Sequence, residues 1–524
     1  MNPNRIKKGT TIFTGKPFVF TLNSKHRTTR CDNCLKSGKL LKCSSCQYVY
    51  YCDRNCQKES WPIHKTECTR LKKVSPKVLP DAARLMARII LKLNQGGAEE
   101  VGYYTEKNFR RFKDLMSHYS DIKVDVKRME HFTMLYGVLS QFLDETFMPN
   151  IAELMGIYGR ICTNSFNILD INMNTIGVGI YLGASVIDHS CKPNAVVVFE
   201  GTTIIVRTLT DLSSLDWSQA SIDKIRISYV DLLNSNKDRR EELHSSYYFW
   251  CDCERCKKEE PMAEVAACPN LSCDSPCSIE ADECEKCNTE ISVEFKETFR
   301  EVVDFTAHHL EKMKTMAYLD VSKICLKKQK GIMHKFNIQH VRTLEMAHIA
   351  AMNLKCWEDA EFYGKELVPG YLLYYGEIHP LTGLLYLTIG KIQLHLEKPK
   401  EALQALTKAN TVLTITHGDK HSIMEEELRP LLYQADMESN SANLLAIDIF
   451  YEWHVESAEQ SALPTLGHRE RKKQLLLLLL AVTYDSCLTV RSTTRDPASF
   501  HEAWIVLTSS GKCNFTRMFY ESSE

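Results

Sequence analysis

The spacing of apolar and polar residues changes several times along the chain. Apolar residues three and four positions apart recur in residues 82–93, which predicts an amphipathic helix there. From residue 161 onward, short runs rich in β-branched residues, such as 195–199 and 203–208, are separated by glycines and predict small sheets. Beyond residue 291 glycines become few and the helical spacing returns, so the C-terminal half is predicted to be an all-α unit.

Two segments of the helical half repeat at the same offset. Residues 354–360, Leu-Lys-Cys-Trp-Glu-Asp-Ala, match residues 396–402, Leu-Glu-Lys-Pro-Lys-Glu-Ala, and residues 376–379, Gly-Glu-Ile-His, match residues 418–421, Gly-Asp-Lys-His. A repeated helical hairpin explains both matches, because stacked hairpins bury a face that a single hairpin leaves exposed. Chance similarity between two helices is the alternative interpretation.

Composition and charge limit the classes of protein to which the chain can belong. Its 524 residues, 44% of them hydrophobic, are enough for about three domains with buried cores. Lys and Arg number 65 against 66 Asp and Glu, so no overall charge attracts nucleic acid or an anionic membrane. The longest apolar run, 475–482, is too short to span a bilayer, and the polar, basic start lacks a secretory signal. We therefore expect neither a membrane protein nor extracellular disulfides.

The 21 cysteines are concentrated in pairs, a distribution typical of metal sites in a chain without an export signal. Residues 31–68 hold eight soft ligands, and interleaved pairing would cross-brace a segment too small for its own core. The predicted ligand sets are Cys31, Cys34, Cys52 and Cys56 for one zinc ion and Cys43, Cys46, His64 and Cys68 for another. Zinc with four protein ligands has no open position for catalysis, so these sites are structural. Unrelated thiols are the alternative interpretation.

Two further groups of cysteines follow later in the chain. One is a triplet that is one ligand short of a tetrahedral site: Cys251, Cys253 and Cys256. The other has the shape of a small zinc ribbon: Cys268, Cys273, Cys284 and Cys287. In this second group the first spacing is loose and Cys277 lies between the two pairs, so a zinc site and a set of free thiols both remain open.

The first cysteine block resembles the MYND zinc finger at every ligand position. Tyr51, Gln57 and the step from Trp61 to His64 also follow the pattern of that finger. MYND fingers dock proline-rich peptide segments of other proteins. The resemblance therefore implies that this block binds protein partners and performs no chemistry.

Four later segments resemble, in order and spacing, the core of the SET methyltransferases. They are Asn164-Ser-Phe166, Gly177-Val-Gly-Ile-Tyr181, Asp188-His-Ser-Cys-Lys-Pro-Asn194 and Ile227-Ser-Tyr229. Together with the finger, they make the chain similar to the SET-and-MYND (SMYD) family of protein-lysine methyltransferases. The resemblance implies an enzyme that moves a methyl group from S-adenosylmethionine to lysine on histone or non-histone proteins. It also implies a monomer that acts in the cytoplasm and the nucleus.

Matched positions carry the residue roles of the family onto this chain. The resemblance implies that Tyr229 is the catalytic phenol and that the aromatic channel for the lysine consists of Phe166, Tyr247 and Phe249. It implies cofactor contacts from Asn164, Ser185, Asp188, His189, Tyr229 and Phe249. It also implies a third, post-SET zinc ion whose ligands are Cys191, Cys251, Cys253 and Cys256. The expected number of zinc ions is therefore three, or four if the ribbon-like group binds one.

The implied fold class is α+β with several domains. A small-sheet SET domain is divided by the MYND finger and a helical insert, and a zinc-bound post-SET segment and an all-α TPR-like C-terminal domain follow. The expected boundaries are 1–30 for the N-terminal part of the SET domain, 31–68 for the finger, 69–160 for the helical insert, 161–230 for the SET core, 231–290 for the post-SET region, 291–438 for the TPR-like domain and 439–524 for a tail without assigned function.

Three departures from the family pattern bear on the expected activity. Residues 8–13 match the segment that follows the family's cofactor-binding G-x-G loop, so we expect that loop to be missing. Asp188 stands where the family has Asn, which replaces an amide that donates and accepts by a carboxylate that only accepts. Residues 213–220 resemble an insertion in place of a tight turn.

An alternative hypothesis is a catalytically inactive adaptor, in which the finger and the helical repeats bind partners and the SET segments serve as scaffold. The missing loop favours it, and a titration with S-adenosylmethionine discriminates the two because an enzyme must bind the cofactor. Sequence-specific DNA binding is not expected, since the finger lacks a base-reading helix and the chain is nearly neutral.

We also expect substrate specificity to lie between the SET core and the helical repeats. The acidic run at residues 425–427 would attract basic peptides to this junction. A solvated helix face is the alternative interpretation of the same run.

Overall fold

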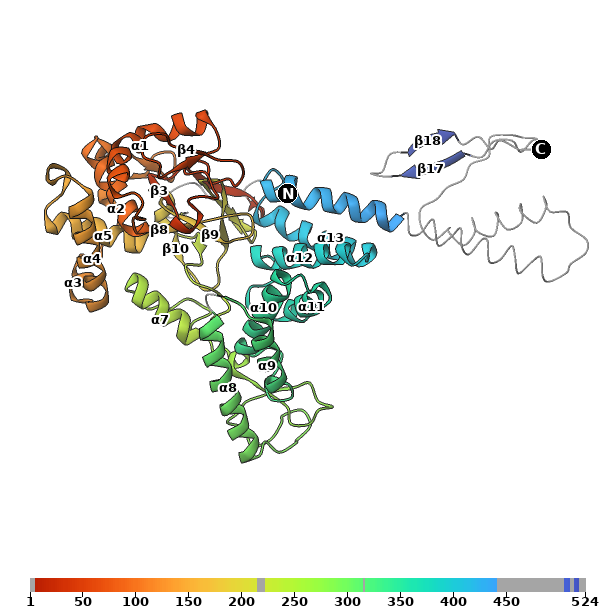
Figure 1. Ribbon diagram of the computed structural model, residues 1–524. Helices are drawn as coiled ribbons and strands as arrows, with labels where there is room; N and C mark the ends of the chain where they lie inside the picture. Colours follow the sequence, from red (N-terminus) through yellow and green to blue (C-terminus); the bar gives the residue numbers. More distant parts are fainter. Residues whose placement is uncertain (1–4, 214–221, 314–315, 441–503, 509–512, 518–524) are drawn as a thin grey trace, which may run out of the picture. The chain divides into compact units, whose positions relative to one another are not determined.

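The computed structural model describes residues 5–213, 222–313, 316–440, 504–508 and 513–517 (Figure 1). The chain divides into two compact units, Met1–Asn440 and Ser441–Glu524. In the second unit the described residues form one antiparallel hairpin of β17 (Trp504–Thr508) and β18 (Cys513–Arg517). The apolar run 475–482, most of the unassigned tail, and the insertion expected after Ser213 lie outside the described residues.

Two small three-stranded sheets form the β part of the first unit. One has the order β11 (Ala195–Glu200), β12 (Thr203–Thr208), β2 (Thr11–Gly15), and the other has the order β3 (Val19–Leu22), β9 (Thr175–Ile180), β8 (Ser165–Leu169). Two short pairs accompany them: antiparallel β1 (Arg5–Ile6) with β13 (Leu212–Ser213), and parallel β10 (Asp188–His189) with β14 (Arg226–Ile227). The predicted small sheets are confirmed. Strands from before residue 30 pair with strands from after residue 165, so both stretches build the same β structure.

Two features stabilise the sheets: alternate side chains of a strand are buried, and neighbouring strands approach closely at a glycine. In β12 every second side chain is buried, including Ile204 and Val206, because successive residues of a strand face opposite sides of the sheet. In β9 a Cβ atom on Gly177 would lie 2.6 Å from the carbonyl oxygen of Thr21, so only glycine allows β3 to pair this closely.

The chain between these strands folds as a cysteine-rich finger followed by helices. The finger contains β4 (Leu41–Lys42), β5 (Tyr50–Tyr51) and α1 (Arg54–Val74), and α1 begins where the Asp53 side chain accepts a hydrogen bond from the Cys56 N–H at 2.8 Å. The helices are α2 (Asp81–Asn94), α3 (Tyr119–Val124), α4 (Val126–Phe142) and α5 (Ile151–Asn164), with a hairpin of β6 (Gly102–Tyr103) and β7 (Phe109–Arg110) among them. The helix predicted over residues 82–93 is α2, whose residues 83–91 are all buried.

The post-sheet region leads into the C-terminal helices. It contains α7 (Asn236–Tyr247) and the short pair β15 (Ala266–Ala267) and β16 (Pro276–Cys277). The helices are α8 (Val293–Met313), α9 (Leu319–Gln329), α10 (Ile338–Asn353), α11 (Trp357–Tyr374), α12 (Pro380–His395) and α13 (Pro399–Thr416), and a π-helical segment η7 (Ile423–Leu428) follows. Each of α8 to α13 packs against the next, as the green-to-blue series in Figure 1 shows. None of the described helices combines the length and apolar character that crossing a lipid bilayer requires.

The repeat seen in the sequence corresponds to two helical hairpins. The matched segments lead into α11 and α13, and the matched alanines Ala360 and Ala402 are fully buried where the helices of each hairpin approach. The matched glycines Gly376 and Gly418 have φ angles of 89° and 91°, a left-handed conformation that glycine adopts without strain after a helix end. A glycine in the left-handed conformation therefore follows the second helix of both hairpins.

A buried cluster of four charges joins the finger to α2. It consists of Asp32, Glu67, Arg84 and Arg88, whose side chains are each at most 4% exposed. Arg84 contacts Asp32 at 2.7 Å and Glu67 at 2.8 Å, and Arg88 contacts Asp32 at 2.8 Å and Glu67 at 2.6 Å. Arg88 also donates to the Phe20 carbonyl at 2.6 Å, which extends the cluster to β3. Burial by itself raises the pKa of both carboxyl groups, but the two arginines outweigh it and lower the pKa of each.

We expect Arg88→Met to lower the free energy of unfolding by about 3–5 kcal/mol. The change leaves two buried carboxylates with one buried cation, and an uncompensated buried charge is costly. Urea-induced unfolding followed by circular dichroism measures the loss.

The matched control is Lys323→Met, which breaks the exposed ion pair with Asp359, whose side chains are 44% and 39% exposed. Exposed pairs contribute at most about 1 kcal/mol, so the control should unfold almost as the wild type does. Equal losses in both variants would contradict the role assigned to the buried cluster.

Candidate functional site

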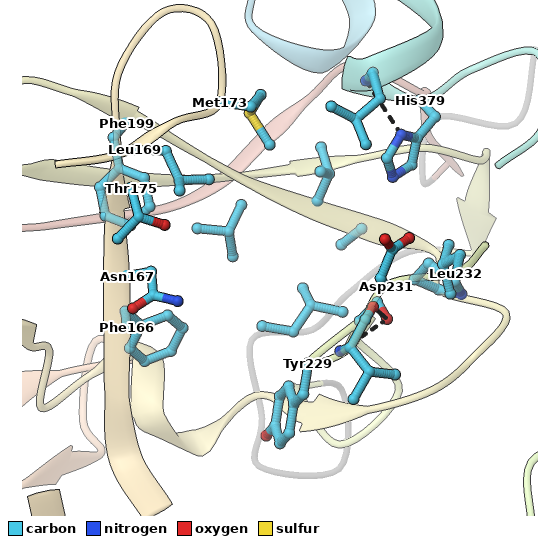
Figure 2. A pocket seen from close by; sticks show the side chains of 18 of the residues that line it. Phe166, Asn167, Leu169, Met173, Thr175, Phe199, Tyr229, Asp231, Leu232 and His379 are labelled. Carbon is cyan, nitrogen blue, oxygen red and sulfur yellow. Dashed lines mark hydrogen bonds between the residues drawn. The ribbon is translucent and has the colours of Figure 1, made fainter. Parts of the chain in front are cut away.

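A cavity of about 560 Å³ lies between the small sheets and the C-terminal helices. Figure 2 shows Phe166, Asn167 and Leu169 of β8 on one wall and Asp231 and His379 on the opposite wall. The polar lining includes Asn164, Asn167, Ser185, Asp231 and His379, and the aromatic lining includes Phe166, Phe199, Tyr229, Tyr247 and Tyr375. The volume and the mixture of polar and aromatic groups are typical of a site for a small organic ligand.

Tyr229, directly after β14, forms the aromatic centre of the cavity. Its hydroxyl donates to the Ile187 carbonyl at 2.5 Å, and its ring centroid lies 5.0 Å from that of Tyr247. Burial and the nearby Asp188 carboxylate raise the pKa of the Tyr229 hydroxyl, so the phenol stays protonated at neutral pH. It therefore acts as a hydrogen-bonding group and not as a base.

His189 holds Tyr229 in place from outside the cavity lining. Its Nδ1 accepts the backbone N–H of Tyr229 at 3.0 Å, and its Nε2 lies 3.2 Å from the Cys191 Sγ atom. Burial, with a smaller contribution from Arg239, lowers the pKa of His189 to about 4. The ring is therefore neutral at physiological pH, and its role is to position Tyr229.

The predicted site residues fall into three places. Those on the cavity wall are Asn164, Phe166, Ser185, Tyr229 and Tyr247. His189 and Phe249 lie just behind, because the Phe249 ring centroid is 6.1 Å from His189 and 6.5 Å from Tyr247. Asp188 differs: its carboxylate is 69% exposed, lies 3.7 Å from Arg226 and is not among the residues that line the cavity.

The approach of Tyr247 and Phe249 to Tyr229 depends on the residue between them. Tyr248 ends α7 in the left-handed conformation, with φ of 62°, and reverses the chain there. Its hydroxyl donates to Asp125 at the start of α4, 3.1 Å away. The helical region between β3 and β8 thus supports one aromatic wall of the cavity.

Within the part of the chain that the structure describes, four groups of side chains have the composition and spacing of metal sites. In each, the possible ligand atoms lie within 4.8 Å of one another, and the groups are Cys31, Cys34, Cys52 and Cys56; Cys43, Cys46, His64 and Cys68; Cys191, Cys251, Cys253 and Cys256; and Cys268, Cys273, Cys284 and Cys287. The structure thus brings together every predicted ligand set, including Cys191 with the distant triplet.

The sulfur distances fit zinc better than disulfides. Cys34 and Cys52 Sγ atoms are 3.4 Å apart, and Cys191 and Cys256 Sγ atoms are also 3.4 Å apart. Tetrahedral Zn–S bonds of about 2.3 Å separate neighbouring sulfurs by about 3.8 Å, whereas a disulfide requires about 2.05 Å. His64 donates from Nδ1 to the buried Glu67 at 3.3 Å, which leaves Nε2 free to face Cys46 at 3.7 Å.

The cavity residues Asp231, Tyr375 and His379 were not among the predicted site residues. Asp231 accepts from the Tyr375 hydroxyl at 2.6 Å and pairs with Arg342 at 2.6 Å. Burial raises the pKa of the Asp231 carboxyl, but Arg342 outweighs it, so this carboxylate is charged beside the cavity. One feature of the sequence could have drawn attention to His379, because His379 and His421 occupy matched positions of the repeat.

These two histidines share one local role. His379 Nδ1 accepts the Leu381 N–H at 3.2 Å, and His421 Nδ1 accepts the Ile423 N–H at 3.2 Å, so each caps the element that follows. His421 also donates from Nε2 to the Phe199 carbonyl of β11 at 2.9 Å. His421 therefore also helps to fix the helical domain against the sheet.

The acidic run expected to attract basic peptides is partly neutralised within the chain. Glu427 lies 2.5 Å from Lys391, and Glu425 lies 3.7 Å from Arg429. The run is not among the residues that line the cavity. Its role in substrate capture stays a prediction.

The chain matches one protein-family model and is similar to several known proteins. A family model described as MYND finger matches residues 31–68. Human histone-lysine N-methyltransferase SMYD3 is 29% identical over 425 residues, covering 80% of this chain and 91% of the relative. Histone-lysine N-methyltransferase ASHR1 of Arabidopsis thaliana is 30% identical over 442 residues, covering 80% and 89%. N-lysine methyltransferase SMYD2-A of Danio rerio is 26% identical over 435 residues, covering 80% and 92%.

We expect the junction behind the cavity to weaken in acid through His417. Its ring centroid lies 4.8 Å from that of His421, and burial, followed by the charges of His421 and Arg207, lowers the pKa of His417 to about 3. The unfolded side chain, with a pKa of about 6.5, takes up a proton first. The stability contribution is therefore present above pH 6.5 and is lost as the pH falls, by about 2 kcal/mol at pH 5.

Urea titrations of the full chain at pH 7.5 and pH 5 measure this loss. His417→Asn removes the titrating group and should lose about 2 kcal/mol less on acidification than the wild type. His308→Asn, at an exposed histidine of α8, is the matched control and should behave as the wild type. An unchanged acid sensitivity in His417→Asn would refute this source of pH dependence.

Proposed function

The chain belongs to the SET-and-MYND family of protein-lysine methyltransferases, and we propose that it performs methyl transfer at the cavity around Tyr229. The observation that carries this location is the convergence of Asn164, Ser185 and Tyr229 on one cavity, with His189 hydrogen-bonded to the Tyr229 N–H. The substrates are lysine side chains of proteins, histone or non-histone. We further propose a monomeric protein of the cytoplasm and nucleus.

The proposed domain layout follows the pairing of the strands. Residues 1–30 and 161–230 together form the SET domain, since β2 pairs with β12 and β3 pairs with β9. The finger at 31–68 and the helical insert at 69–160 divide it, and the post-SET region spans 231–290. The helical hairpins of residues 291–438 form a TPR-like domain whose residues Tyr375 and His379 complete the cavity.

The residues of the cavity fit S-adenosylmethionine by their chemistry. Asn164 and Ser185 supply polar groups and Phe166 and Tyr247 supply aromatic surfaces, the two kinds of contact that a nucleoside joined to an amino acid requires. When bound, this cofactor supplies an activated methyl group. Asn164 and Ser185, with the backbone around His189, would hold it.

The contribution of the protein is to orient a neutral lysine amine and to exclude water. The ring centroids of Tyr229 and Tyr247 lie 5.0 Å apart, and Phe249 packs behind these two rings. Aromatic rings of this kind favour an amine that gains positive charge. Because the Tyr229 hydroxyl is protonated and already donates to Ile187, its oxygen lone pairs are free to accept an amine N–H. The Cys191 group ties residues 251–256 to the cavity and so keeps Phe249 in place.

Three zinc ions and a partner-binding surface complete the proposal. Two ions occupy the finger and one occupies the Cys191 group, where closed four-ligand sites serve structure. Trp61 of the finger is 48% exposed, and an exposed aromatic ring is the usual contact for proline-rich peptides. We propose that the finger binds such segments of protein partners.

Methyl transfer from radiolabelled S-adenosylmethionine to histones and other lysine-containing proteins tests the activity. Tyr229→Phe should lower kcat about tenfold or more, because it removes the hydroxyl that accepts from the amine and that anchors the ring to Ile187. Tyr363→Phe, a buried tyrosine of α11 outside the cavity lining, is the matched control and should keep wild-type kcat.

Calorimetric titration with S-adenosylmethionine separates the enzyme from an inactive adaptor. The enzyme should bind the cofactor with measurable heat, and the adaptor has no need to bind it. A chain that neither binds the cofactor nor labels any substrate would overturn the proposed activity. Equal rates for Tyr229→Phe and the wild type would instead refute only the role given to Tyr229.

A further inference from the structure

The fourth group of cysteines lies outside the cavity around Tyr229. Cys268 and Cys273 come from one turn, Cys284 and Cys287 from another, and their Sγ atoms all lie within 4.8 Å of one another. The Cys268–Cys287 distance is 3.4 Å and the Cys273–Cys284 distance is 4.0 Å. Both distances bracket the sulfur separation of about 3.8 Å in tetrahedral zinc sites and are far too long for disulfides.

The fifth thiol of this segment, Cys277, neighbours Cys284 and Cys268 but is not part of the group of four. Cys277 donates to the Ser275 carbonyl at 3.8 Å and stands outside the group of four. The Thr289 hydroxyl, by contrast, lies 3.1 Å from Cys287 and supports that ligand as a neighbouring hydrogen-bonding group. The structure therefore brings together one complete set of four soft donors. The spacing in the sequence left open whether these cysteines bind zinc or are free thiols.

The segment has too little apolar core to keep this arrangement by burial. Its buried cluster contains Cys268, Cys277, Cys284 and Ile291, with only a few partly buried neighbours such as Phe295. Three of those four buried side chains are cysteines. Segments of this size fold when a metal or another covalent link holds them.

We propose that Cys268, Cys273, Cys284 and Cys287 bind a zinc ion, in addition to the three ions assigned above. Four thiolates in a closed tetrahedral set are the donors that zinc takes in structural sites. With no ligand position left for water or substrate, this ion serves structure and takes no part in methyl transfer.

The place of the segment indicates what the ion stabilises. In Figure 1 its yellow-green loops lie beside α8 and α9. Ala267 N–H donates to the Ile332 carbonyl at 2.8 Å, and His334 Nε2 donates to the Asp274 carbonyl at 3.0 Å, so the segment docks on the connection between α9 and α10. Ile291 N–H donates to the Asp282 carbonyl at 2.8 Å just before α8 begins. The ion thus fixes the entry to the helical domain.

Metal analysis of the purified full chain by inductively coupled plasma mass spectrometry tests the site. We expect four zinc ions per wild-type chain and three in the double variant Cys268→Ser, Cys284→Ser. Cys277→Ser changes a buried cysteine of the same segment that is outside the set, and it should retain four. Equal zinc content in the wild type and the double variant, or iron as the metal lost, would overturn the proposal.

A measurement on the unaltered protein covers the case in which the double variant fails to fold. Alkylation with iodoacetamide, read by mass spectrometry, should label the partly exposed Cys356 rapidly and leave Cys273 and Cys287, which are also partly exposed, protected until a chelator is added. Labelling of Cys273 and Cys287 at the rate of Cys356 without chelator would refute metal binding. Both readouts are independent of methyl transfer, so failure here leaves the proposed activity intact.

Discussion

The parallel pairing of β10 with β14 is the constraint on which the rest of the site depends. It places His189 beside Ile227, two residues before Tyr229, and allows His189 to accept the Tyr229 N–H at 3.0 Å. Because the histidine is buried and neutral, this hydrogen bond persists across the physiological pH range. The same strand leads to Cys191, which meets the cysteines of residues 251–256. One crossing of the chain therefore positions the phenol, the aromatic wall and a metal site together.

A second constraint acts where the finger meets α2. Four fully buried charges are expensive to desolvate, and each is compensated by two partners of opposite sign. These contacts hold α2 against the finger. Glu67 also receives the His64 N–H, so the arrangement of the charges and the orientation of a predicted zinc ligand are coupled.

The helical hairpins contribute more than a stack of helices. Their repeated Gly and His residues end one helix and cap the next element, and the same histidines lie at the junction with the sheet. Tyr375 and His379 complete a cavity whose opposite wall lies about two hundred residues earlier in the chain. The closing wall of the cavity thus belongs to a part of the chain that carries none of the SET-like segments.

The sequence by itself determined the features that are local. Metal-ligand pairs, small β runs, α2 and the hairpin repeat are set by residues within a few turns of one another, because ligand spacing and periodicity act over short distances. Only the tertiary structure decided which distant groups meet. It completed the set of Cys268 and brought Asp231 and His379 to the cavity, and it brought Cys191 to residues 251–256, a meeting that the family resemblance implied but local spacing did not. It also left the Asp188 carboxylate exposed beside Arg226. Such contacts arise from packing and charge compensation between segments, which no local spacing encodes.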